Sequence, residues 1–180
     1  GRSLSDLKRK IGLKKLFYAG NHGFETTGPG IGSKRHIPKA QAAVIKKISR
    51  EIRGTLKGVK DIIFEDKGLT LSIHHRLAAE KTKLAVKDKI RTICAPLIKK
   101  KLIRTGSGKE VIEIRPHLSW GKGSAVMWLL KKEHLTRSSV LAIYIGDDLT
   151  DEDAFRIVNK GGLSIFVGKP PKRSQSKYFL

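Results

Sequence analysis

Two short apolar segments near the C-terminus, separated by a predicted helix, constrain the fold more than any other feature of the sequence. VLAIYIG (140–146) and LSIFVG (163–168) are almost continuously apolar, which is typical of strands buried on both faces of a parallel sheet. Between them, TDEDAFRIVNKGG (150–162) has the pattern of a helix that ends at Gly161. A strand, a helix and a second strand in this order predict a parallel α/β unit.

The strands predicted in the middle of the chain have one apolar face and one polar face. GLTLSIHHR (68–76) alternates apolar and polar residues. EVIEIRP (110–116) alternates in the same way, so that Glu113 and Arg115 share a face. This pattern predicts a small mixed α and β layer with one solvated sheet face.

Amphipathic helices are predicted around these strands, at residues 38–53 and 83–98. The loop TTGPGIGSKRHIP (26–38) is rich in residues that break regular structure, and Pro116 ends the last of the two-faced strands. We therefore expect this loop and Pro116 to border an inserted domain. A further helix is predicted at 121–132.

The chain is strongly basic, with 38 Lys and Arg residues against 16 Asp and Glu residues and a formal net charge of +22. Such a charge favours association with nucleic acid. The basic residues are scattered, however, and no basic run carries the interleaved aromatic residues of a single-strand binder. We therefore do not expect the chain to bind nucleic acid.

The single cysteine, Cys94, excludes an internal disulfide and fits a reducing compartment. No apolar run approaches the roughly 20 residues that cross a membrane. We expect a cytoplasmic protein without a membrane partner.

The segment IGDDLTDEDAF (145–155) concentrates five carboxylates in a basic chain. Asp147 and Asp148 follow a predicted strand of a parallel sheet, at the edge where such sheets bind ligands. Two adjacent carboxylates repel one another unless a cation compensates their charge. Oxygen ligands of this kind suit Mg²⁺, so this pair predicts a magnesium site.

The remaining carboxylates of this segment have a simpler explanation as the start of a helix. Thr150 is predicted as the N-cap residue, with Asp153 three positions later. Asp151 and Glu152 then lie in the first turn, where the helix dipole favours negative charge.

Lys122 lies between two glycines at the start of the helix predicted at 121–132. A cation at a helix N-terminus opposes the helix dipole, unless it reaches an anion that this end of the helix also attracts. Together with the carboxylates that follow it, Lys122 indicates a site that handles phosphate.

These residues resemble the trehalose-6-phosphate phosphatases, a family of the haloacid dehalogenase-like hydrolase superfamily. GDDLTDEDAF (146–155) resembles the metal-binding signature of that family. Further similar blocks occur in the family's order over essentially the whole chain: FYAGNHGFE (17–25), KGLTLSIHHR (67–76), VIEIRPHLSWGKGSAV (111–126) and SKYFL (176–180).

The resemblance implies an α/β fold in which a small α/β cap domain is inserted into a Rossmann-like hydrolase core. The core would comprise residues 1–25 and 118–180, and the cap residues 26–117. The activity implied is magnesium-dependent hydrolysis of trehalose 6-phosphate to trehalose and phosphate through an aspartyl-phosphate intermediate.

Site roles carried over from the family fall into three groups. Lys122 would stabilise the nucleophile and the phosphoryl oxygens, and Asp147 would bind Mg²⁺ with support from Asp148 and Asp151. The residues expected to bind substrate are Asn21, His22, Gly23, Glu65, Lys67, His74, Arg76, Glu113 and Arg115. A wet sheet surface with exposed ion pairs of little energetic value is the alternative for the members of this group in the cap.

The sequence departs from the family in one respect that bears on activity. The family's Asp-x-Asp-Gly-Thr motif, which carries the nucleophile, is absent, and the one Asp-x-Asp (Asp151 to Asp153) is followed by Ala154. We therefore expect an incomplete core, with its first part missing, and a chain that is inactive alone. The alternatives are a phosphatase of another sugar phosphate, or a non-catalytic protein that binds sugar phosphate or nucleic acid.

Overall fold

The computed structural model describes residues 2–108, 110–136 and 138–180. The chain divides into two compact units, each described here by itself. Unit 1 comprises Gly1–His36 and Ser119–Leu180, and unit 2 comprises Ile37–Leu118.

The border between the units lies later in the chain than the expected start of the insert at residue 26. The difference arises because β2 (Glu25–Gly28) and β3 (Ile31–Arg35) extend an antiparallel sheet from β1 (Tyr18–Gly20). Backbone hydrogen bonds of this sheet hold residues 26–35 to unit 1. The breaker-rich loop of the sequence is thus largely a β-hairpin.

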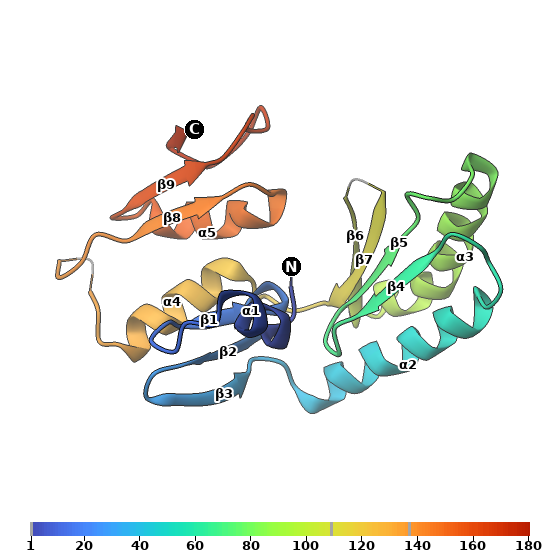
Figure 1. Ribbon diagram of the computed structural model, residues 1–180, viewed down its shortest axis with the longest axis horizontal. Coiled ribbons are helices and arrows are strands. Elements are labelled where there is room, and N and C mark those ends of the chain that lie inside the picture. The colour runs from blue at the N-terminus through green and yellow to red at the C-terminus, as the bar shows by residue number, and fades with distance from the viewer. Residues whose placement is uncertain (1, 109, 137) are drawn as a thin grey trace. The chain divides into compact units, whose positions relative to one another are not determined.

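Unit 2 is an antiparallel sheet of order β4-β5-β7-β6, with α2 (Lys39–Thr55) and α3 (Glu80–Lys99) packed on one face (Figure 1). The predicted alternation explains this arrangement, because Leu71 and Ile73 face the helices and Ser72 does not. The expected layer with one polar sheet face is confirmed. The strands are β4 (Ile63–Asp66), β5 (Leu71–His74), β6 (Ile103–Gly108) and β7 (Val111–Pro116).

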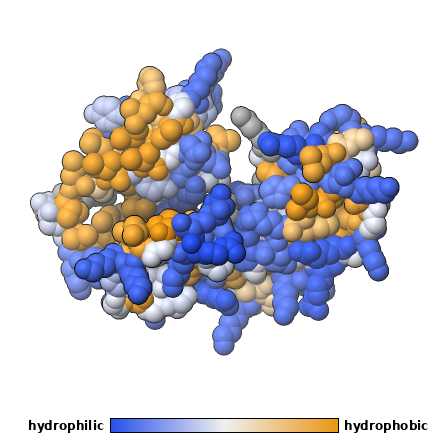
Figure 2. Space-filling view, in the orientation of Figure 1, coloured by the Kyte–Doolittle hydropathy of each residue, from blue (hydrophilic) through white to orange (hydrophobic). Residues whose placement is uncertain are grey.

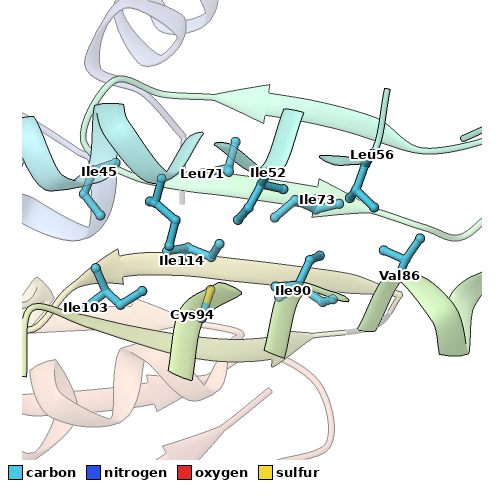
Figure 3. Close-up of a cluster of buried hydrophobic side chains, with 12 residues drawn as sticks. Ile45, Ile52, Leu56, Leu71, Ile73, Val86, Ile90, Cys94, Ile103 and Ile114 are labelled. Atoms are coloured by element: carbon cyan, nitrogen blue, oxygen red, sulfur yellow. The ribbon is translucent and has the colours of Figure 1, made fainter. Parts of the chain in front are cut away.

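The core of unit 2 is a cluster of branched aliphatic side chains and Cys94 between the helices and the sheet (Figure 3). Ile52 of α2 and Ile90 of α3 point toward Ile73 of β5 and Ile114 of β7 (Figure 3). Each such side chain stabilises the fold by about 1.5–3 kcal/mol when it is fully buried.

Unit 1 contains a second, parallel sheet of order β10-β9-β8. Its strands are β8 (Ile143–Gly146), β9 (Leu163–Phe166) and β10 (Tyr178–Phe179). The helix α5 (Glu152–Val158) covers one face, where Phe155 contacts Tyr144 edge-on at 5.6 Å between ring centroids. The parallel strand–helix–strand unit predicted for this part of the chain is confirmed.

The other face of this sheet is exposed, which corrects the prediction that residues 140–146 are buried on both faces. Ile143 and Ile145 are 57% and 60% exposed. Figure 2 shows the apolar surface that gathers over β8 and β9. The prediction is wrong because α5 covers only one face, and no other element of the described residues covers these two side chains.

The remaining elements of unit 1 are two helices and two short 3₁₀ turns. They are α1 (Leu4–Ile11), α4 (Lys122–Lys132), η1 (Asn21–Gly23) and η2 (Leu149–Asp151). The helix predicted at 121–132 corresponds to α4 and is confirmed.

An aromatic stack joins the two segments of unit 1 that border the insert. The chain leaves unit 1 after His36 and returns at Ser119. The ring of His36 stacks on Trp120, with centroids 4.3 Å apart and an interplanar angle of 11°. Nε2 of His36 lies 2.8 Å from Oγ1 of Thr26, and burial lowers the pKa of this histidine.

Candidate active site

Asp147 and Asp148 lie directly after β8, at the carboxyl edge of the parallel sheet. Both residues are exposed there. The residue before them is Gly146, where the chain passes so close to Asp151 that no side chain fits. A Cβ on Gly146 would lie 2.5 Å from Cγ of Asp151. The edge that sequence analysis expects to bind a cation therefore presents two adjacent carboxylates.

The turn after β8 begins with a cap different from the predicted one. Asp148, and not Thr150, is the N-cap residue: its Oδ1 accepts a hydrogen bond from the backbone N–H of Thr150 at 3.3 Å. Oδ2 of Asp151 in turn accepts from the N–H of Asp148 at 3.1 Å, which completes a capping box. The prediction of Thr150 is wrong because a 3₁₀ turn, η2, precedes α5 and moves the cap two residues earlier.

Asp151 is the centre of a buried polar cluster. It is 3% exposed, and its Oδ1 accepts hydrogen bonds from Nζ of Lys122 at 2.7 Å and from the hydroxyl of Tyr144 at 2.6 Å. Burial by itself would raise the pKa of Asp151, but the hydrogen bonds from Lys122 and Tyr144 outweigh it and hold the pKa below its ordinary value. A direct hydrogen bond thus joins Lys122 to the acidic segment.

Tyr144 is a member of this cluster that the sequence analysis misses. Its pKa is raised, first by burial and then by its hydrogen bond to Asp151. The available signal is a tyrosine inside an otherwise apolar strand, because a buried tyrosine hydroxyl needs a polar partner.

The two glycines beside Lys122 allow the start of α4 to approach the start of α5. The backbone N–H of Gly123 donates to Oδ2 of Asp153 at 3.1 Å. A Cβ on Gly123 would lie 2.6 Å from the backbone oxygen of Asp153, and a Cβ on Gly121 would collide with the carboxylate of the same residue. This close approach explains the Gly-Lys-Gly sequence.

Asn21, His22 and Gly23 form η1, next to the start of α4. Asn21 and His22 are buried and both have positive φ angles, of 51° and 58°, which are uncommon for residues other than glycine. Nδ2 of Asn21 donates to Glu25 at 2.8 Å. The indole N–H of Trp120 donates to the backbone oxygen of Gly23 at 2.7 Å, so this turn is fixed to the segment that precedes Lys122.

Five of the six cap residues expected to bind substrate lie on or beside the sheet face of unit 2 opposite the helices. Strand register aligns Glu65 with Ser72, and Ser72 with Glu113. Nζ of Lys67 donates to Oγ of Ser72 at 2.8 Å and lies 3.2 Å from the carboxylate of Glu65. Nε2 of His74 lies 3.2 Å from the same carboxylate.

Burial by itself would raise the pKa of Glu65, but its hydrogen bond with His74 and the charge of Lys67 hold the pKa below its ordinary value. On β7, Nε of Arg115 lies 3.9 Å from the carboxylate of Glu113. Arg76 is the exception, since it lies exposed in the turn after β5.

Two further residues of this polar face, Ser72 and Arg104, were not among the expected site residues. Ser72 is 2% exposed, and its Oγ accepts the hydrogen bond from Lys67. Arg104 of β6 pairs with Arg115 of β7 in the strand register. The alternation of LSIHH could have indicated Ser72, because that residue shares a face with His74.

Within residues 2–108, 110–136 and 138–180, no group of three or more His, Cys, Asp or Glu side chains could hold a metal ion. The described residues also include no helix that is long and apolar enough to span a bilayer.

The fold is that of solved sugar-phosphate phosphatase structures. The chain is similar to the C-terminal domain of the C. albicans trehalose-6-phosphate phosphatase, with a TM-score of 0.76 and 20% identity, over 99% of this chain and 70% of that chain. A protein described as trehalose-6-phosphate phosphatase related gives a TM-score of 0.76 at 24% identity, over 99% and 71%. These likenesses confirm the expected fold class.

The sequence comparisons identify the family. The trehalose-phosphatase family model matches residues 1–180, so the chain belongs to the trehalose-phosphatase family. Similar curated proteins include the trehalose-phosphate phosphatases of Mycobacterium tuberculosis H37Rv, 36% identical over 171 residues, and Mycobacterium marinum, 33% identical over 174 residues. Each alignment covers 93% of this chain and 42% of the relative, so the chain spans less than half the length of these proteins.

Proposed function

We propose that the chain carries the metal-binding and sugar-recognising part of a cytoplasmic, magnesium-dependent trehalose-6-phosphate phosphatase. The proposal rests on one observation: in a chain of this family, Lys122 joins the carboxylates of the turn after β8 in a single cluster through Asp151. The reaction is hydrolysis of trehalose 6-phosphate to trehalose and phosphate.

The donors at the edge of β8 fit magnesium. Asp147 and Asp148 are exposed and offer hard oxygen ligands, which Mg²⁺ prefers, and Asp151 supports them from behind. Magnesium usually takes only one or two carboxylates and completes its coordination with water and substrate phosphate, so a cluster of three protein ligands is not required. When bound, the ion neutralises charge on the phosphoryl group.

Lys122 is the residue of this chain that would contact the phosphoryl group. It begins α4, whose N-terminus favours anions, and its side chain is 24% exposed. An ammonium group has three N–H donors, and the hydrogen bond to Asp151 uses one of them. Lys122 therefore stays in place while it donates to a phosphoryl oxygen.

The polar sheet face of unit 2 supplies the sugar-binding groups. Glu65, Lys67 and His74 hold one another in position, and rigid, convergent polar groups are what a sugar hydroxyl network requires. Glu113 and Arg115 continue this face, and Arg76 and the buried turn Asn21–Gly23 complete the proposed substrate-binding set.

The attacking aspartate is not among the residues of this chain. Asp151 and Asp153 form the one Asp-x-Asp of the sequence, and oxygens of both accept hydrogen bonds within the turn and from α4. We propose that a segment with an Asp-x-Asp-Gly-Thr motif, outside these 180 residues, provides the nucleophile. The chain alone then has no turnover.

The test compares the 180-residue chain with a longer form of the protein that carries the motif. Magnesium-dependent phosphate release is expected from the longer form only, with loss in Lys122→Ala and Asp147→Ala but not in Asp88→Ala, a control at an exposed aspartate of α3. Turnover by the short chain, or normal turnover in Asp147→Ala, would contradict the proposal. Comparison of phosphate release from trehalose 6-phosphate, sucrose 6-phosphate and glucose 6-phosphate identifies the preferred sugar.

A further inference from the structure

Tyr144 connects the rigid sheet of unit 1 to the charged cluster of the candidate active site. Its hydroxyl donates to Oδ1 of Asp151 at 2.6 Å, and Nζ of Lys122 donates to the same oxygen at 2.7 Å. The second oxygen, Oδ2, accepts from the N–H of Asp148 at 3.1 Å. Three donors from β8, α4 and the turn after β8 therefore converge on one side chain that is 4% exposed.

The three donors differ in how firmly each is held. Tyr144 lies in a strand that pairs with β9, and its ring packs edge-on against the buried ring of Phe155. Lys122, in contrast, reaches Asp151 through a flexible four-carbon chain, which has high rotamer entropy. Tyr144 therefore sets the orientation of the carboxylate, and Lys122 adopts the position that this orientation allows.

We propose that Tyr144 is a positioning residue, which orients the carboxylate of Asp151 and through it the ammonium group of Lys122. The inference rests on the proposed function, since it gives Lys122 a fixed place from which to bind a phosphoryl group. It assigns to Asp151 the task of holding the lysine, while Asp147 and Asp148 present the exposed carboxylates.

The sharing of one oxygen has a chemical consequence for Lys122. A carboxylate that also accepts a short hydrogen bond from a neutral hydroxyl has part of its charge already compensated. Asp151 therefore holds Lys122 in place without neutralising it as fully as an isolated carboxylate would. The lysine keeps a positive field for an anionic substrate at the N-terminus of α4.

The test replaces Tyr144 with phenylalanine, which keeps the ring and removes the hydroxyl. Tyr18→Phe is the matched control, because the Tyr18 hydroxyl also donates a hydrogen bond of 2.6 Å, to the backbone oxygen of Leu13. Both variants lose one hydrogen bond, so a merely structural role would affect them alike. Only Tyr144→Phe should change Lys122.

The first readout is nuclear magnetic resonance of the 180-residue chain with ¹⁵N-labelled lysine. We expect the ammonium protons of Lys122 to exchange with water markedly faster in Tyr144→Phe, and at the unaltered rate in Tyr18→Phe. Unchanged exchange in Tyr144→Phe would overturn the inference. If that variant does not fold, the test is made on the unaltered chain, where we expect a nuclear Overhauser effect between the Tyr144 hydroxyl proton and the Lys122 ammonium protons. The absence of this effect would overturn the inference.

The second readout is catalysis in a longer form that carries the nucleophile. Tyr144→Phe should lower kcat roughly 10- to 100-fold with little change in KM, since a misplaced catalytic group costs rate rather than substrate binding. Tyr18→Phe should leave kcat unchanged. If the longer form has no phosphatase activity but Tyr144→Phe still changes the Lys122 resonance, the inference is supported and the proposed function is refuted. If the longer form is active and Tyr144→Phe leaves kcat unaltered, the inference alone is refuted.

Discussion

Replacement of Lys122 by methionine tests the ion pair at the centre of the candidate site. Methionine keeps the length of the side chain but removes the ammonium group that lies 2.7 Å from Oδ1 of Asp151. The carboxylate is only 4% exposed, so water cannot replace the lost donor, although the Tyr144 hydroxyl and the Asp148 N–H remain. A buried acceptor that loses a charged partner costs about 1–3 kcal/mol, and we expect the free energy of unfolding to fall by that amount at neutral pH.

The pH dependence of this loss has a defined sign. In the unaltered chain the pKa of Asp151 lies below its ordinary value of 3.8, because the hydrogen bonds outweigh the effect of burial. The pair therefore contributes stability that is present above the unfolded-state pKa and is lost as pH falls through the folded-state pKa. The difference in stability between the two proteins therefore persists down to the unfolded-state pKa of about 4 and shrinks as the pH falls below it.

The assay is urea unfolding followed by circular dichroism, at neutral pH and at about pH 3, which is below the unfolded-state pKa of about 4. Lys34→Met is the control, since it removes one positive charge from an exposed position in β3. The reasoning fails if Lys122→Met is as stable as Lys34→Met at neutral pH, or if the difference grows as the pH is lowered.

Two further substitutions test the packing of unit 1, and a third, in α2 of unit 2, is the control for the first. Gly123→Ala should destabilise the chain by about 1–3 kcal/mol in urea unfolding, because its Cβ would lie 2.6 Å from the backbone of Asp153. Gly54→Ala, which meets nothing within 4 Å in α2, should instead stabilise it by roughly 0.5–1 kcal/mol, and equal effects would contradict the close approach of α4 and α5. Ile145→Lys should change stability by less than about 0.5 kcal/mol and reduce self-association in light scattering, since Ile145 is 60% exposed; a large loss of stability would show that this face is covered.

Most of unit 2 could be predicted from its sequence, because its two patterns agree with each other. The alternation around Leu71 and Ile73 predicts a sheet with one apolar face, and the amphipathic helices provide the partner for that face. The polar residues that alternate with the apolar ones along these strands, such as Glu65 and His74, must then lie on the opposite face of the sheet. The candidate sugar-binding surface follows from this period of two.

The details of unit 1 depend on contacts that no local pattern contains. The apolar run at 140–146 predicts burial on both faces, but burial also requires a covering element, and α5 covers only the face of Tyr144. Thr150 and Asp148 are both good N-cap residues, and the 3₁₀ turn selects Asp148. The link from Tyr144 through Asp151 to Lys122 spans three elements, so it becomes visible only when they are folded together.

The stack of His36 on Trp120 has a consequence for how easily residues 37–118 can be replaced by another segment. Both ends of residues 37–118 start from the same aromatic pair, so the host fold already holds the two attachment points together. Replacing the insert, by another domain or by a short linker, then requires little additional ordering of the chain at the junction. Residues 37–118 can then change during evolution while the cluster around Asp151, which lies wholly in unit 1, stays intact.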